Sequence, residues 1–169
     1  MQSTNLKNII VVDDDRSIRV VISTALTRAG YNVKSSGTAA GMRRLVESDF
    51  ADILITDVGL PDGDALDVLP KLQHMKPRLK IIVMSARTTL LTAVRAKKKG
   101  AFEYLPKPFD LDELLNLVSN TFSEHNNFKI KDQTALPKNI YDSGPVVGKS
   151  MAMQEIYKLI SRLVNTNLN

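Results

Sequence analysis

Residues 53–57 read ILITD, a short and mostly apolar run that ends in a single carboxylate, Asp57. Residues 60–63, LPDG, follow as a turn. Short apolar runs bounded by turn residues are typical of parallel strands that are covered on both faces. The stretch therefore predicts a buried strand over 53–56 that delivers Asp57 to one edge of a sheet.

Three other apolar runs also end in charged or polar residues. Residues 9–12 lead into Asp13, Asp14 and Asp15, residues 80–84 lead into Ser85, and residues 102–105 lead into Pro106, Lys107, Pro108 and Phe109. The carboxyl ends of parallel strands share one edge of a sheet, where ligands bind at the topological switch point. Carboxylates, a hydroxyl and an ammonium at that edge predict a site for a divalent cation and a phosphoryl group.

Helical patterns separate the strands along the chain. Apolar residues recur at helical spacing after the first strand as far as Gly30, and a further strand is expected over 32–36. The other expected helices follow the N-cap Thr38, span 65–75, span about 89–99, and follow the N-cap Asp110 with Leu111, Leu114, Leu115, Val118 and Phe122 inward. Five strand–helix repeats predict an α/β fold, a flavodoxin-like doubly wound sheet with parallel strand order 2-1-3-4-5.

The composition is that of an ordinary globular protein. The 169 residues are 43% hydrophobic and 24% charged. The absence of cysteine excludes disulfides and cysteine-based zinc sites. No apolar run approaches the roughly 20 residues of a membrane span, and the N-terminus lacks a signal-peptide pattern. We expect a cytoplasmic protein with no membrane partner.

The net charge of +5 raises nucleic-acid binding as a possible function. The basic residues are scattered, however, apart from a cluster at Arg95 and residues 97–99. Aromatic residues make up only 5% of the chain, which disfavours a base-stacking surface. We do not expect this chain to read DNA directly.

The acids at the ends of the strands suggest a metal site. Mg²⁺ prefers oxygen ligands and is usually held by one or two carboxylates together with waters. Asp13, Asp14 and Asp57 supply such oxygens, and adjacent acids repel one another without a cation. Capping of the first helix is the alternative role for these acids, and we assign it to Asp15.

Asp57 also fits the role of a nucleophile. A carboxylate can attack phosphorus and form an acyl phosphate, and catalysis of phosphoryl transfer consists mostly of positioning and electrostatic stabilisation. Lys107 and the hydroxyl of Ser85 can supply both, and a cis Lys107–Pro108 bond would direct the ammonium inward. A turn-forming serine and a solvated lysine are the alternatives.

Four segments carry a resemblance to a known family: VVDDD, ILITDVGLPDGDALDVL, IIVMSA and GAFEYLPKPFDLDEL. Over residues 8 to 123 they closely resemble the receiver domain of bacterial two-component response regulators. The resemblance implies that Asp57 is the phosphoryl acceptor and that Mg²⁺ is the cofactor. It also implies that Asp13 and Asp14 form an acidic pocket, with Asp14 a direct metal ligand.

The same resemblance assigns roles to four other residues. The carbonyl of Gly59 completes the metal ligands, Ser85 is the switch hydroxyl, Tyr104 is the switch aromatic residue, and Lys107 is the lysine of the site. Gly59 departs from the bulkier residue often found there in the family. Because a backbone carbonyl needs no side chain, we expect metal binding to survive and the rate of dephosphorylation to differ.

GAFEYLPKPFD and the tail GPVVGKSMAMQEIYKLISRL resemble the NtrC-like, sigma-54-dependent activators. The resemblance implies a receiver at 1–124, a linker at 125–145, and the truncated start of an AAA+ domain at 146–169 with a helix at 151–164. Gly148-Lys149-Ser150 does not complete a P-loop, because Gly144 leaves three residues before it where the motif needs four. We therefore expect no ATPase activity, and contacts with sigma-54 RNA polymerase and DNA only through domains absent from this chain.

The implied function is a phosphorelay. A sensor histidine kinase donates a phosphoryl group to Asp57, and the face formed by the helix at 89–99, the strand at 102–105 and the last helix changes shape to control oligomerisation and transcription. A homodimer through this face and the linker is expected. Arg95 and residues 97–99 could there meet Asp110, Asp112 and Glu113 of a second subunit, although a solvated basic face is the alternative.

Two alternatives to transcriptional control stay open. The chain could act as a stand-alone truncated receiver, a phosphoryl sink or binding module without transcriptional output. A haloacid-dehalogenase-type phosphatase also uses an aspartyl nucleophile, but it needs a second acid two residues later, where this chain has Gly59. We expect a phosphoacceptor and not an enzyme of multiple turnover.

Overall fold

A five-stranded parallel sheet organises the chain. The computed structural model describes residues 7–87 and 89–127, and the chain forms two compact units, residues 1–111 and 112–169. The sheet lies in the first unit with strand order β2-β1-β3-β6-β7. In that order the strands are Asn32–Ser36, Asn8–Val12, Ile53–Asp57, Lys80–Ser85 and Glu103–Pro106. The predicted order 2-1-3-4-5, counted over the strands of this sheet, is confirmed.

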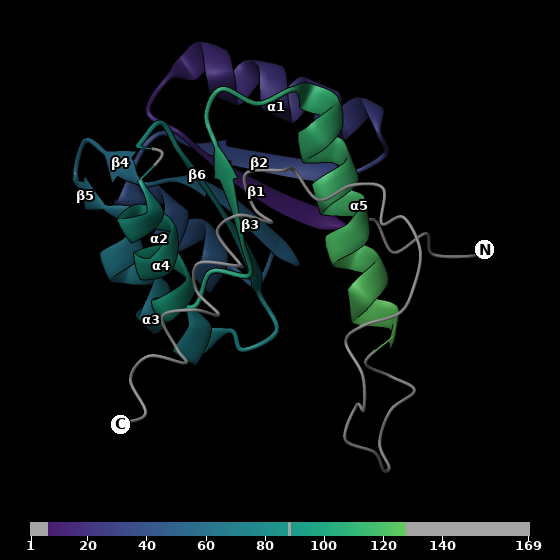
Figure 1. Cartoon of the computed structure of the whole chain (residues 1–169). Coiled ribbons are helices and arrows are strands. Elements are labelled where there is room, and N and C mark those ends of the chain that lie inside the picture. The colour runs from purple at the N-terminus through teal and green to yellow at the C-terminus, as the bar shows by residue number, and fades with distance from the viewer. Residues whose placement is uncertain (1–6, 88, 128–169) are drawn as a thin grey trace, which may run out of the picture. The chain divides into compact units, whose positions relative to one another are not determined.

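Helices of the first unit cover the sheet on two sides. They are α1 (Arg16–Arg28), α2 (Ala39–Glu47), α3 (Ala65–Met75) and α4 (Leu90–Lys98). Figure 1 shows α1 along one side of the sheet, while α2, α3 and α4 gather on the other. Helix α5 (Leu111–Asn127) begins at the last residue of the first unit and otherwise belongs to the second.

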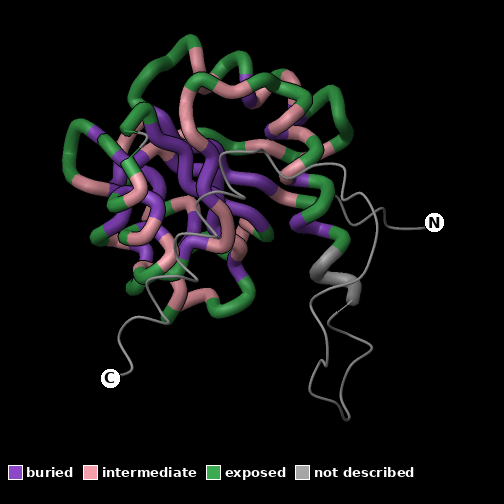
Figure 2. The backbone as a smooth tube through the Cα atoms, viewed as in Figure 1, coloured by how far each residue is buried: buried purple, intermediate pink, exposed green. Residues whose placement is uncertain are grey.

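The three inner strands form the buried centre of the first unit (Figure 2). Every residue of β1 from Ile9 to Val12 has no exposed surface, and Ile53–Thr56 of β3 are at most 1% exposed. The edge strand β2 has no buried residue. Because close packing holds the inner strands on both faces, the residues at their carboxyl ends are fixed relative to one another.

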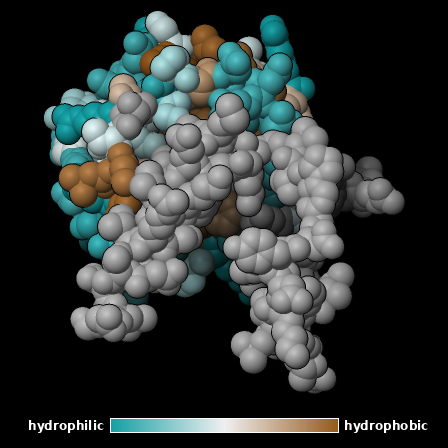
Figure 3. Space-filling view, viewed as in Figure 1, coloured by the Kyte–Doolittle hydropathy of each residue, from teal (hydrophilic) through white to brown (hydrophobic). Residues whose placement is uncertain are grey.

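The surface is mostly hydrophilic in the view of Figure 3, with small separate hydrophobic areas. Among the described residues, the exposed large apolar side chains are Val20, Val21, Leu91 and Leu111. The prediction that Leu111 faces inward is therefore wrong, since 37% of this residue is exposed. Leu111 is the first residue of α5, so no earlier turn of this helix covers it, whereas Leu111 itself precedes the buried Leu114.

Two helix boundaries are informative. Thr38 caps α2 as predicted, with its side-chain oxygen accepting from the N–H of Gly41. Helix α5 continues through Asn127 and so includes the first three residues of the expected linker, 125–127, because backbone hydrogen bonding continues after the apolar periodicity has ended. The rest of the expected linker, the helix at 151–164 and Gly148-Lys149-Ser150 lie outside the described residues.

The predicted turn at 60–63 is a small antiparallel hairpin of β4 (Gly59–Leu60) and β5 (Gly63–Asp64). Its tip is attached to the start of α2: the carboxylate of Asp62 accepts hydrogen bonds from the N–H groups of Ala39 at 2.7 Å and Ala40 at 2.9 Å. Asp64 caps α3 by accepting from the N–H of Leu66. Carboxylates of one hairpin thus hold the amino ends of two helices, where negative charge is favoured.

Asp62→Asn is expected to lower the unfolding temperature at neutral pH, since an amide can accept only one of the two hydrogen bonds. The N–H groups of Ala40 and Ala39 hold the pKa of Asp62 below its usual 3.8. A carboxylate whose pKa is lowered by folding stabilises the folded state above the unfolded pKa, and this contribution is lost as the pH falls through the folded pKa. The difference in unfolding temperature from wild type should therefore shrink below pH 3.8.

Circular dichroism at neutral pH and at several lower values measures this difference. Asp110→Asn, which changes another exposed acid, serves as the control. A destabilisation by Asp62→Asn that is the same at every pH would contradict the role of the charge.

Candidate metal and phosphoryl site

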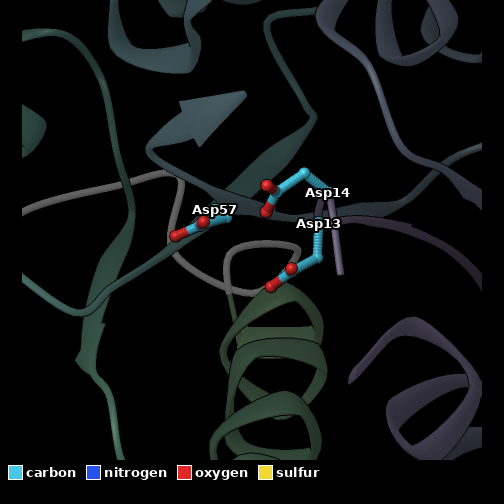
Figure 4. Close-up of side chains that lie close together, drawn as sticks. All are labelled: Asp13, Asp14 and Asp57. Atoms are coloured by element: carbon cyan, nitrogen blue, oxygen red, sulfur yellow. The ribbon is translucent and has the colours of Figure 1, made fainter. Parts of the chain in front are cut away.

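Three carboxylates meet at the carboxyl edge of the sheet. Asp13 and Asp14 follow β1, and Asp57 is the last residue of the neighbouring strand β3. One oxygen from each lies within 4.8 Å of the others, and Figure 4 shows the three side chains at this edge. Asp13 is buried, Asp57 is half-buried and Asp14 is exposed. The cluster therefore has a buried side and a side open to solvent.

Lys107 provides the positive charge beside these acids. Its Nζ lies 2.6 Å from Oδ2 of Asp13 and 3.5 Å from Oδ1 of Asp57. The N–H of Lys107 donates to the carbonyl of Ser85 at 2.8 Å, and the Lys107–Pro108 bond is cis. The structure thus brings together three carboxylates and one ammonium, which leaves an excess of negative charge.

The electrostatics of Asp57 reflect this excess. Burial raises the pKa of the Asp57 carboxyl above its usual 3.8, the nearby ammonium of Lys107 opposes the shift, and the charge of Asp13 adds to it. The ionised form of Asp57 is therefore less stable in the folded protein than in water. A cation at the cluster would relieve this cost.

Asp15 stands apart from the cluster, as predicted. Its side-chain oxygen accepts from the N–H groups of Ser17 at 2.7 Å and Ile18 at 3.2 Å, so it caps α1. The N–H of Asp15 donates to Oδ1 of Asp13 at 2.9 Å. Both oxygens of Asp13 are thus engaged by donors, one by this N–H and the other by Lys107.

Ser85 lies at the end of β6 and Tyr104 lies on the neighbouring strand β7, and both residues are 2% exposed. The hydroxyl of Ser85 accepts from the N–H of Arg87 at 3.0 Å, and the hydroxyl of Tyr104 donates to the carbonyl of Arg87 at 2.8 Å. Burial raises the pKa of Tyr104, and a hydrogen bond with Ser85 opposes this shift. Tyr104 is therefore already inward, joined to the loop between β6 and α4.

Gly59 lies two residues after Asp57, on the exposed side of the β4–β5 hairpin. Its φ angle lies outside the left-handed region, and an added Cβ would meet no atom within 4 Å. Nothing in the local packing therefore requires glycine, and there is room for a Cβ at this position.

Arg19 is a residue of this region that the sequence analysis missed. Its Nη1 donates to the backbone carbonyls of Asp13 at 2.6 Å and Asp14 at 3.1 Å. The spacing of five and six residues makes Arg19 the fourth residue of the helix that follows the acids, about one turn in, where a long side chain can reach back. An arginine at this distance after an acidic turn is the signal that could have identified it.

The basic cluster of α4 has partners within the chain. Arg95 pairs with Asp64 and Lys99 with Asp67, each at 3.4 Å, and Lys97 pairs with Glu103 at the same distance. The pairs of Arg95 and Lys99 are exposed, and exposed ion pairs of this length are worth little in stability. Pairing of the same cations with a second subunit would nevertheless have to displace these contacts.

The strand order of the doubly wound parallel sheet places the chain in the flavodoxin-like class of α/β proteins, and the acidic site lies at the carboxyl edge of this sheet. Residues 9–119 match the family model described as "Response regulator receiver domain". The chain belongs to this family, whose members act as phosphoacceptors of two-component systems.

The chain is also similar in sequence to transcriptional regulators named NtrC. It is 47% identical over 163 residues to the DNA-binding transcriptional regulator NtrC of Bradyrhizobium sp. (strain RP501 Parasponia), a match that covers 95% of this chain and 33% of the relative. The chain spans about a third of the length of the curated relatives it matches. The NtrC-like resemblance is confirmed.

Solved structures of receiver domains are also similar to this chain, among them the following two. A CheY-like receiver domain protein from Methanospirillum hungatei JF-1 has a TM-score of 0.71 at 28% identity and covers 73% of this chain and 99% of that one. The beryllofluoride-activated NtrC4 receiver domain dimer has a TM-score of 0.67 at 32% identity and covers 71% of this chain and 99% of that one.

None of the helices in the described part of the chain has the length and apolar character that crossing a membrane requires.

Proposed function

We propose that this chain accepts a phosphoryl group on Asp57 from a sensor histidine kinase in the cytoplasm. The observation that carries the proposal is the position of Asp57, which has an oxygen within 4.8 Å of oxygens of Asp13 and Asp14 and whose Oδ1 lies 3.5 Å from the Nζ of Lys107. This arrangement supports transfer to the carboxylate, because a cation held by the acids and the nearby ammonium can together stabilise and position the anionic phosphoryl group beside the nucleophile.

The transfer exchanges one bond to phosphorus for another. A carboxylate oxygen of Asp57 forms a P–O bond as the P–N bond of the donor phosphohistidine breaks, and the imidazole leaves with the electron pair of that bond. Lys107 would stabilise charge on one phosphoryl oxygen, and the hydroxyl of Ser85 would donate to another. The raised pKa of Asp57 means that the ionised nucleophile is lost at a higher pH than for an ordinary carboxylate.

The donor set fits Mg²⁺. Three carboxylates face one ammonium, and oxygen is the ligand atom that Mg²⁺ prefers. Asp13, Asp14 and Asp57 would hold the ion together with the carbonyl of Gly59. Because donors already engage both oxygens of Asp13, the exposed Asp14 is the better candidate for a direct ligand. When bound, the ion would neutralise negative charge on the cluster and on the phosphoryl oxygens.

Phosphorylation would act on the rest of the domain through Ser85 and Tyr104. A hydrogen bond from Ser85 to the phosphoryl group would compete with the hydrogen bond between the hydroxyls of Ser85 and Tyr104, and Tyr104 in turn donates to the carbonyl of Arg87. The loop between β6 and α4 would then shift, and with it the face of α4, β7 and α5. Helix α4 is suited to move because its buried residues, Thr92, Ala93 and Ala96, are small.

We infer that this switch controls homodimerisation through that face and the linker, and thereby transcriptional activation. Similarity to a beryllofluoride-activated NtrC4 receiver dimer and to NtrC regulators supports this role. In this proposal residues 1–124 are the receiver, 125–145 the linker and 146–169 the start of an AAA+ domain, and contacts with sigma-54 RNA polymerase and DNA belong to other domains. A phosphoryl sink without transcriptional output is the second candidate.

Transfer from a kinase tests the proposal. A histidine kinase labelled with radioactive phosphate should pass its label to this chain in the presence of Mg²⁺, and light scattering should then show a dimer. Transfer without a change in mass would favour the phosphoryl sink, and absence of transfer from every kinase tried would contradict the proposal.

Gly59→Met is expected to slow the loss of the phosphoryl group several-fold while leaving its uptake intact. An added Cβ at this position meets no atom within 4 Å, so methionine can be accommodated two residues after Asp57, where it should partly shield the acyl phosphate from attacking water. The rate is measured by following phosphorylated protein after excess phosphodonor is removed. Gly59→Ala, which adds only a methyl group, is the matched control, and an unchanged rate in Gly59→Met would contradict the prediction.

A further inference from the structure

The backbone of the acid pair is held by a charged side chain from α1. Nη1 of Arg19 lies 2.6 Å from the carbonyl oxygen of Asp13 and 3.1 Å from that of Asp14. Hydrogen bonds from a charged donor are stronger than those between neutral groups. The two carbonyls belong to consecutive residues, so a single guanidinium fixes the orientation of the turn that carries both carboxylates.

Gly37 makes room for this guanidinium. A Cβ built at Gly37 would lie 2.8 Å from Nη1 of Arg19 and 3.3 Å from its Cζ, and the three nearest atoms all belong to this side chain. The φ angle of Gly37 lies outside the left-handed region, so alanine would not strain the backbone. The glycine is therefore needed for the position of Arg19 and not for the path of the chain.

We infer that Arg19 is a positioning residue that holds Asp13 and Asp14 in the orientation that binds a divalent cation, an inference that rests on the proposed function. Removal of Arg19 should change the affinity for the cation in opposite directions if the side chain acts as a clamp or only as a nearby positive charge. As a positive charge near the site, Arg19 would repel a cation, and its removal would tighten binding. As a clamp on the backbone, its removal would weaken binding, because the carboxylates would have to be ordered when the ion binds.

Titration calorimetry of MgCl₂ into the chelator-treated full chain measures this effect. Arg19→Met should weaken Mg²⁺ affinity by about 10-fold, the lower end of the loss found when groups that orient metal ligands are removed. Arg19→Lys, which keeps the charge but not the fork of donors, should recover part of the affinity. Arg16→Met removes a charge from the exposed start of the same helix and should leave the affinity equal or slightly tighter.

Each outcome decides the inference. Equal or tighter binding by Arg19→Met would overturn it while leaving the proposed function intact. Failure of the wild-type chain to bind Mg²⁺ would instead remove the metal from the proposed function, and the inference with it. If circular dichroism shows that Arg19→Met does not fold, Gly37→Ala decides, since it displaces the guanidinium without removing its charge: weaker binding supports the clamp, and unchanged binding overturns it.

Discussion

Asp57→Asn is expected to abolish uptake of a phosphoryl group from acetyl phosphate and Mg²⁺. The amide is close to the carboxylate in shape but carries no negative charge and is not a nucleophile toward phosphorus. Asp57 is the carboxylate of the cluster that lies both half-buried and within 3.5 Å of Lys107, so no neighbouring acid offers the same geometry. A gel that retards phosphorylated proteins measures the effect directly.

The matched control is Asp67→Asn, which removes a carboxylate from the exposed side of α3. This variant should be phosphorylated as the wild type is. Phosphorylation of Asp57→Asn at a rate near that of the wild type would show that another residue is the acceptor.

Asp57→Asn should also stabilise the folded protein when no Mg²⁺ is present. Burial raises the pKa of Asp57 above 3.8, so its ionised form is disfavoured in the folded state. The wild type therefore loses stability as the pH rises from the unfolded pKa to the folded pKa, and the variant does not. The advantage of the variant should appear only above pH 3.8.

Lys107→Met is expected to destabilise the metal-free protein by about 3 kcal/mol, the scale found when one partner of a buried ion pair is removed. Lys107 is the cation that faces the buried carboxylate of Asp13, at 2.6 Å, and methionine would leave that charge without a counterion. Urea unfolding with a chelator present measures the loss. Mg²⁺ should then restore more stability to the variant than to the wild type, because it supplies the missing positive charge.

The double variant Asp13→Asn with Lys107→Met is the control for this interpretation. It removes both charges, so it should be more stable without metal than Lys107→Met alone. Equal stability of Lys107→Met and wild type in the chelator would contradict the account of the site as an unbalanced acidic cluster.

The position of the site could be predicted because strand periodicity determines where each strand ends. Asp13, Asp57, Ser85 and Lys107 each follow or close a strand, and a parallel sheet brings those ends to one edge. Nothing beyond the order of apolar runs and turns was needed for this prediction. The resemblance of the surrounding segments to receiver domains agreed with it.

The contacts that hold the site could not be predicted in this way. The Asp62 carboxylate accepts hydrogen bonds from backbone amides 22 and 23 residues earlier. Arg19 donates to backbone carbonyls, which every residue has, so the sequence does not indicate which of them are bonded. Such contacts depend on the path of loops, for which apolar periodicity gives no information. The ion pair of Lys97 with Glu103 is likewise a consequence of how the chain returns after α4.

Intact-mass spectrometry of the wild-type chain, mixed with acetyl phosphate in the presence and absence of Mg²⁺, tests the central claim most directly. We predict the addition of one phosphoryl group with Mg²⁺, little or none in a chelator, and fragment ions that place the group on Asp57. A folded wild-type chain that gains no phosphoryl group with Mg²⁺ present, or that carries it on another residue, would contradict the account.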